Sequence, residues 1–82
     1  MIFLIVYDRR TALIVNLMQY DESDRLEAEN SKLSIELDLH RKGIDQEVVL
    51  LEAENEQALR RTHRRYFESA TEIGSPVTPS KN

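Results

Sequence analysis

The chain has 82 residues, of which 40% are hydrophobic and 32% are charged, with a formal net charge of −4 and no cysteine. This length corresponds to one small domain, which buries only about 60% of the surface of its unfolded chain. Such a domain usually depends on disulfides, a metal or a partner chain, and the lack of cysteine excludes disulfides and thiolate metal sites. We therefore expect self-association. The acidic charge also disfavours a protein that binds nucleic acid over most of its surface.

The first apolar run, residues 1–7, is too short to cross a membrane. A secretory signal would carry its basic residues before such a run, whereas Arg9 and Arg10 follow it. We expect a cytoplasmic protein that makes no membrane contact.

Two strands are predicted at the start of the chain. Residues 2–7 (IFLIVY) are apolar at every position, which is typical of a strand buried on both faces. Residues 8–11 form a polar turn, in which the Asp8 carboxylate can accept hydrogen bonds from its own backbone. Residues 12–20 resume the strand character, and polar Asn16 and Gln19 place this second strand nearer an edge. The two strands form a hairpin.

The next segment is a helix that Asp21 or Ser23 can cap and that Gly43 ends, as a left-handed residue after the last turn. Its apolar residues lie in two stripes on opposite sides. One stripe consists of Leu26, Leu33, Leu37 and His40, and the other of Ala28, Ile35 and Leu39. A helix with two apolar stripes needs two partners.

Residues 46–53 (QEVVLLEA) predict a third strand, and Asn55 caps a second helix. The apolar face of this helix consists of Ala58, Leu59, Thr62, His63, Tyr66, Ala70 and Ile73, with Phe67 at its rim. Residues 1–73 thus form a single domain. Residues 74–82 contain two prolines and little that could be buried, so they are predicted to be a disordered tail.

The resulting order, β-β-α-β-α, predicts an α+β fold. The all-apolar first strand takes the centre of a three-stranded sheet of order 2-1-3, and both helices are expected on one face. The alternative is a coiled coil, because Leu26, Leu33 and His40 are seven residues apart. Gly43 and the β-branched residues that follow interrupt that repeat after two heptads, fewer than such a structure needs.

Four arginines, Arg60, Arg61, Arg64 and Arg65, are close together on the second helix. Glu56 lies four residues before Arg60, and Glu68 lies four residues after Arg64, so both arginines have partners at helical spacing. This pattern favours a solvated, salt-bridged surface. The alternative is a contact with an anion or nucleic acid. Tyr66 and Phe67 add little to that alternative, because their rings turn toward the core.

We expect no catalytic, metal or cofactor site. His40 and His63 are expected to be partly buried structural residues, because they lack further ligands at the spacing of a metal site. Asp21, Glu22 and Asp24 are explained by helix capping and lack the pattern of a calcium loop. The sequence also has no glycine-rich phosphate loop, no Gly-x-Ser-x-Gly motif and no cysteine nucleophile.

With both helices on one face, the other face of the sheet would be apolar and bare. The main hypothesis is therefore a non-enzymatic interaction module, an adaptor or regulator that forms a homodimer. Its candidate interface consists of Phe3, Ile5, Tyr7, Ala28, Ile35 and Leu39. The alternatives are a regulatory protein that binds nucleic acid through Arg60, Arg61, Arg64 and Arg65, and a binder of small molecules between the sheet and the helices.

Overall fold

A computed structural model describes residues 1–68 of the chain. Its strands are β1 (Ile2–Asp8), β2 (Leu13–Tyr20) and β3 (Glu47–Glu52), and its α-helices are α1 (Arg25–Lys42) and α2 (Glu56–Thr62). Two short 3-10 helices, η1 (Glu22–Asp24) and η2 (Arg64–Tyr66), precede α1 and follow α2. The predicted tail, residues 74–82, and the expected end of the second helix lie outside the described residues.

The sheet has the order β2-β1-β3, and β1 pairs antiparallel with both neighbours. The predicted α+β class and strand order are thus confirmed. Ile2 and the five residues after it in β1 are all buried, as expected for a central strand that is apolar on both faces. The two outer strands lie only partly in the core. Leu13 and Val15 of β2 are more than half exposed.

The turn between β1 and β2 is built by Asp8. Its carboxylate accepts hydrogen bonds from the backbone N–H groups of Arg10 (2.9 Å) and Thr11 (3.4 Å), as predicted. Ala12 closes the turn by donating to the backbone oxygen of Asp8 (2.8 Å) and takes a left-handed conformation, φ 60°. The strand register then shifts between Val6 and Tyr7, which leaves Val15 without a paired residue in β1.

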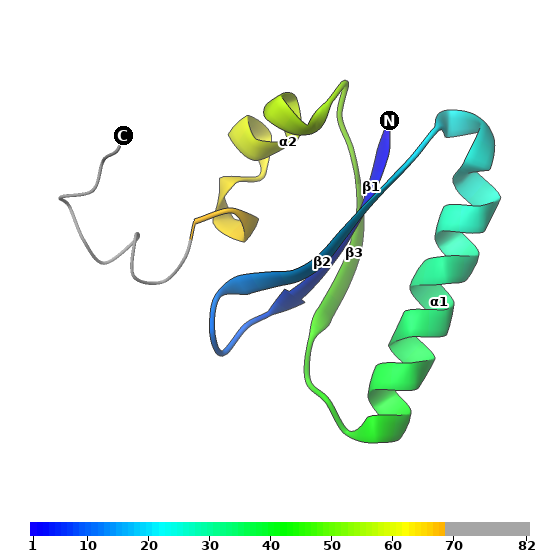
Figure 1. Cartoon of the computed structure of the whole chain (residues 1–82), viewed down its shortest axis with the longest axis vertical. Helices are drawn as coiled ribbons and strands as arrows, with labels where there is room; N and C mark the ends of the chain where they lie inside the picture. Colours follow the sequence, from blue (N-terminus) through cyan, green and yellow to red (C-terminus); the bar gives the residue numbers. More distant parts are fainter. Residues whose placement is uncertain (69–82) are drawn as a thin grey trace, which may run out of the picture.

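The two helices lie on opposite faces of the sheet, with α1 on one side and the α2–η2 segment on the other (Figure 1). Phe3, Ile5 and Tyr7 pack under Leu59 and Tyr66. On the other face, Leu4, Val6 and Val48 pack under Ile35 and Leu39 of α1. The expectation that both helices share one face is therefore wrong. The physical reason is β1 itself, because a strand that is apolar on both faces needs a cover on each.

The start of α1 differs from the prediction, whereas its end agrees with it. Neither Asp21 nor Ser23 caps the helix through its side chain; instead, the one-turn 3-10 helix η1 leads into α1. At the other end Gly43 has φ 69°, and its N–H and that of Ile44 donate to the backbone oxygens of His40 (3.1 Å) and Leu39 (2.9 Å). This pair of bonds closes the helix as predicted for a left-handed glycine.

The second helix begins where the sequence predicts but ends early. The Asn55 side chain accepts a hydrogen bond from the Ala58 N–H (2.8 Å), so its capping role is confirmed. The helix stops at Thr62, because His63 has φ −125° and ψ 53°, and η2 follows as a separate turn. Within the described part of the chain, none of the helices is both long enough and apolar enough to cross a membrane.

Candidate functional site

Most of the candidate interface predicted from the sequence is buried inside the chain. Phe3 and Ile5 are fully buried and Tyr7 is 7% exposed, all beneath the α2–η2 segment. Ala28 is fully buried, and Ile35 and Leu39 pack against the α1 side of the sheet. The sheet face that was predicted to be bare is covered by the α2–η2 segment. Phe3, Ile5, Tyr7 and Ala28 therefore lie in the core of the chain, and Ile35 and Leu39 are half-buried against it.

The exposed apolar surface of α1 is the second stripe seen in the sequence. Leu26, Leu33 and Leu37, which we call the outer stripe, are 70%, 56% and 53% exposed and point away from the sheet. Asn30 and His40 lie on the same side of the helix and are also exposed. Both stripes are visible in the sequence, but the predicted interface lies on the one that the sheet covers. Large exposed apolar residues in a row on one helix are a sign of an association surface.

Charge is distributed unevenly along the outer stripe. Glu27 and Glu29 flank its beginning, whereas His40, Arg41 and Lys42 form the last turn of the helix. At the midpoint Glu36 pairs with Lys32 (2.8 Å). The helix thus has an acidic beginning and a basic last turn, in which Lys42 pairs with Asp38 (3.1 Å).

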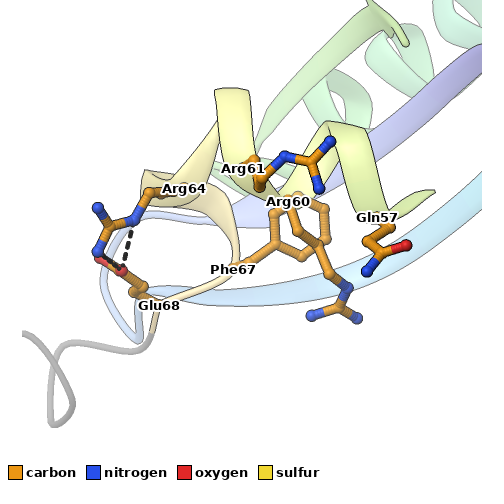
Figure 2. Close-up of a pocket in the computed structure, with 6 residues that line it drawn as sticks. All are labelled: Gln57, Arg60, Arg61, Arg64, Phe67 and Glu68. Carbon is orange, nitrogen blue, oxygen red and sulfur yellow. Dashed lines mark hydrogen bonds and ion pairs between the residues drawn. The ribbon is translucent and has the colours of Figure 1, made fainter. Parts of the chain in front are cut away.

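Two of the four arginines predicted as an alternative contact are paired at helical spacing. The Arg60 guanidinium donates to Glu56 through two nitrogens (2.9 and 3.1 Å). Arg64 makes the same double contact with Glu68 (2.7 and 3.1 Å), as the dashed lines of Figure 2 show. Both pairs confirm the partners expected from the sequence, although Arg64 lies on η2 rather than on a continuous α-helix.

Arg65 belongs to a different cluster, which was not predicted from the sequence. Its guanidinium donates to Glu47 of β3 (3.0 Å) and lies over the Tyr66 ring at 4.1 Å. The Tyr66 hydroxyl also donates to Glu47 (2.7 Å), and Arg9 approaches the same carboxylate at 3.5 Å. Burial raises the pKa of Tyr66, and the hydrogen bond to Glu47 raises it further. No sequence signal marks this cluster, because its members come from three separate segments.

A shallow hollow of about 370 Å³ lies over the arginine surface. Its lining consists of Gln57, Arg60, Arg61, Arg64, Phe67 and Glu68, and Figure 2 shows these side chains around the Phe67 ring. The Arg60 guanidinium lies 4.7 Å from the centre of that ring. Phe67 is half-buried, which agrees with its predicted place at the rim, and Tyr66 is buried as predicted. The hollow combines guanidinium groups with an aromatic wall, but carboxylates neutralise two of its three arginines.

The remaining candidate residues, the histidines and the acidic residues before α1, do not lie together in one site. His40 is exposed, so its expected partial burial is wrong, whereas His63 is half-buried as expected. Within residues 1–68 no three histidine or acidic side chains lie close enough together to hold a metal ion. The acidic residues before α1 act locally: Arg25 donates to Glu22 (2.8 Å) and also pairs with Glu52. The hydrogen bond from Arg25 lowers the pKa of Glu22.

Comparison with protein-family models, with curated proteins and with solved structures finds no match to this chain.

Proposed function

We propose that this chain is a non-enzymatic interaction module of the cytoplasm that self-associates as a homodimer and acts as an adaptor or regulator. The observation that carries the proposal is the outer stripe, three leucines more than half exposed on a helix whose other side is already buried. Elsewhere in the described residues β1 is covered on both faces and Leu13 and Val15 of β2 are exposed, so α1 offers the longest row of exposed apolar side chains.

The short length of the stripe is compatible with this proposal. Two heptads are too few for an isolated coiled coil, since an isolated helix of this length is only marginally stable in water. Here α1 is already ordered, because Ala28, Ile35 and Leu39 attach it to the sheet. Association through the outer stripe therefore requires little additional ordering of the backbone, and preorganisation of this kind improves affinity.

Sedimentation equilibrium tests the proposal. At micromolar concentrations we expect about twice the mass of one chain. Leu33→Glu introduces a charge at the centre of the outer stripe and should yield a folded monomer, because Leu33 is 56% exposed. Leu13→Glu, at a β2 residue that is 52% exposed, is the matched control and should leave the dimer intact. A wild-type chain that stays monomeric at high concentration would contradict the proposal.

The alternative is a nucleic-acid-binding regulatory protein that uses Arg60, Arg61, Arg64 and Arg65. The hollow beside Phe67 supports it, because guanidinium groups and an aromatic ring together suit phosphates and bases. It has less support than self-association, since Glu56, Glu68 and Glu47 already pair with Arg60, Arg64 and Arg65. A gel shift that weakens with salt, and weakens further when Arg60, Arg61 and Arg64 are replaced by lysine, would favour it.

A further inference from the structure

We infer that the dimer forms through antiparallel packing of α1 against α1 of a second copy, with the two-fold axis on the outer side of the helix, between Leu33 and Leu37, and with Leu33 against Leu37 of the partner subunit. This inference rests on the self-association proposed above and specifies its geometry. The outermost layers of the assembly would then be the two α2 helices, followed inward by the two sheets and, at the centre, the two α1 helices.

The residues on the outer side of α1 are spaced so that an antiparallel copy of the helix places them opposite one another. Leu26, Leu33 and His40 are seven residues apart, and so are Asn30, Leu37 and Ile44, which alternate with them at intervals of four and three. Two kinds of facing pair follow when two such helices run in opposite directions about residue 35, and each occurs twice in the dimer. These pairs are Leu33 with Leu37 and Asn30 with His40; Leu26 then lies against the partner's chain near the end of α1, where Ile44 is 43% exposed just beyond the helix.

These pairs match in chemistry as well as in position. Leucines meet leucines at the centre, and each of the two polar layers beside it joins an amide to an imidazole. Asn30 and His40 can exchange a hydrogen bond there, because each carries both donors and acceptors. A polar pair within an apolar seam fixes the register, since any shift would place Asn30 or His40 against leucine.

The charges beside the seam favour the antiparallel direction. Glu27 and Arg41 lie on the same flank of the helix, so antiparallel packing brings each Glu27 toward Arg41 of the partner subunit. The least favourable contact joins the two Glu36 side chains near the axis, and Lys32, 2.8 Å from Glu36 within each subunit, compensates that charge.

Parallel packing is the competing geometry. It would place Glu36 near Arg41 of the partner subunit, which is favourable. It would also bring the acidic beginnings of both helices side by side, with Asp24, Glu27 and Glu29 of each copy together, and would face His40 with itself. Because like charges then meet at the beginning of α1 and His40 faces itself near the end, the antiparallel arrangement is the one that the helix supports.

The natural lack of cysteine makes a direct experiment possible, since an introduced thiol has no competitor. Full-length Asn30→Cys and His40→Cys chains, distinguishable by mass, are mixed, oxidised gently and analysed without reductant. Antiparallel packing predicts a disulfide mainly between the two different chains, because these positions face each other across the interface. Arg10→Cys, in the exposed hairpin turn, is the matched control and should cross-link poorly with either chain.

Each outcome separates the geometry from the proposed function. Disulfides that join Asn30→Cys to itself and His40→Cys to itself would establish parallel packing and overturn this inference, while the dimer would stand. A dimer in sedimentation that Leu33→Glu leaves unchanged, with no cross-link through α1, would place the interface elsewhere and also overturn it. The absence of any dimer would defeat both the inference and the proposed function.

A charge exchange provides a second test. Glu27→Arg and Arg41→Glu should each weaken dimerisation, by about two- to ten-fold in dissociation constant, since exposed ion pairs contribute little individually. The double variant, which restores opposite charges across an antiparallel interface, should recover most of the loss. A double variant weaker than both single variants would contradict the antiparallel contact between these two positions.

Discussion

At the scale of single residues, Glu47 has the densest set of polar contacts among the described side chains. Its side chain is 17% exposed, and its carboxylate accepts from Tyr66 and Arg65 while Arg9 lies nearby. The Tyr66 ring packs edge-on against Tyr7 with centroids 5.1 Å apart. Glu47 therefore attaches η2 to the sheet through β3, and Tyr7 does so through β1.

Replacing Glu47 with glutamine should lower the free energy of unfolding by about 1–2 kcal/mol, because the hydrogen bonds that it accepts lose their charge assistance. Urea denaturation measures the effect. Glu56→Gln removes an exposed ion pair with Arg60 and is the control, with an expected loss of less than about 0.5 kcal/mol. Equal losses in the two variants would show that the Glu47 cluster is no stronger than a surface pair.

Tyr66 should make the protein sensitive to alkali. Burial and Glu47 raise the pKa of its hydroxyl, so the folded state holds this proton more tightly than the unfolded chain does. The corresponding stability is fully present below the ordinary tyrosine pKa and is lost as pH rises through the higher pKa of the folded state. Melting temperatures measured between pH 8 and pH 11 should thus fall less steeply in Tyr66→Phe than in wild type. Parallel curves would contradict this role.

At the scale of elements, α2 depends on its cap more than a long helix would, because it has only seven residues. Asn55→Ala removes the acceptor for the Ala58 N–H and should cost about 1 kcal/mol in the free energy of unfolding. Asn55→Asp keeps an acceptor at the same place and should restore nearly all of that loss. A chain that tolerates alanine as well as aspartate would show that packing of Leu59 alone holds the helix.

The sequence predicted the elements that depend on local chemistry. The Asp8 turn, the Asn55 cap and the left-handed Gly43 each follow from one residue and its immediate neighbours, and the structure contains all three. The early end of α2 was missed, because the amphipathic spacing continues past Thr62 while the backbone turns away at His63. Periodicity detects which residues are apolar but not where a backbone leaves the helical conformation.

At the scale of the whole molecule, both faces of β1 should contribute similarly to stability. Ile2 and Ile5 are fully buried and point to opposite faces, Ile2 toward the α1 side and Ile5 toward the α2 side. Ile2→Val and Ile5→Val should each cost about 0.5–1.5 kcal/mol in urea denaturation. Val15→Thr, at a β2 residue that is 55% exposed, is the control and should change little. A negligible cost at Ile5 would mean that α2 does not cover its face.

The error about the candidate site has the same origin as the error about helix placement. The hairpin and the sheet order follow from the β1 sequence, but the face on which α2 packs depends on how the chain turns between β3 and Asn55. Once α2 lies opposite α1, Phe3, Ile5 and Tyr7 become core, and the unpaired apolar surface moves to Leu26, Leu33 and Leu37. The two stripes of α1 were visible in the sequence, whereas which of them meets the sheet was not.

The central position of β1 also has a consequence for synthesis of the protein. Residues 2–7 emerge from the ribosome ahead of every segment that covers them, since Ile35, Leu39, Leu59 and Tyr66 all follow later in the chain. Residues 2–7, the most apolar segment, therefore stay uncovered until nearly all of the described residues have been synthesised. Exposed strands of this kind attract chaperones and promote aggregation during synthesis. Conditions that slow translation after residue 20 should therefore reduce the yield of soluble protein more than conditions that destabilise the finished fold.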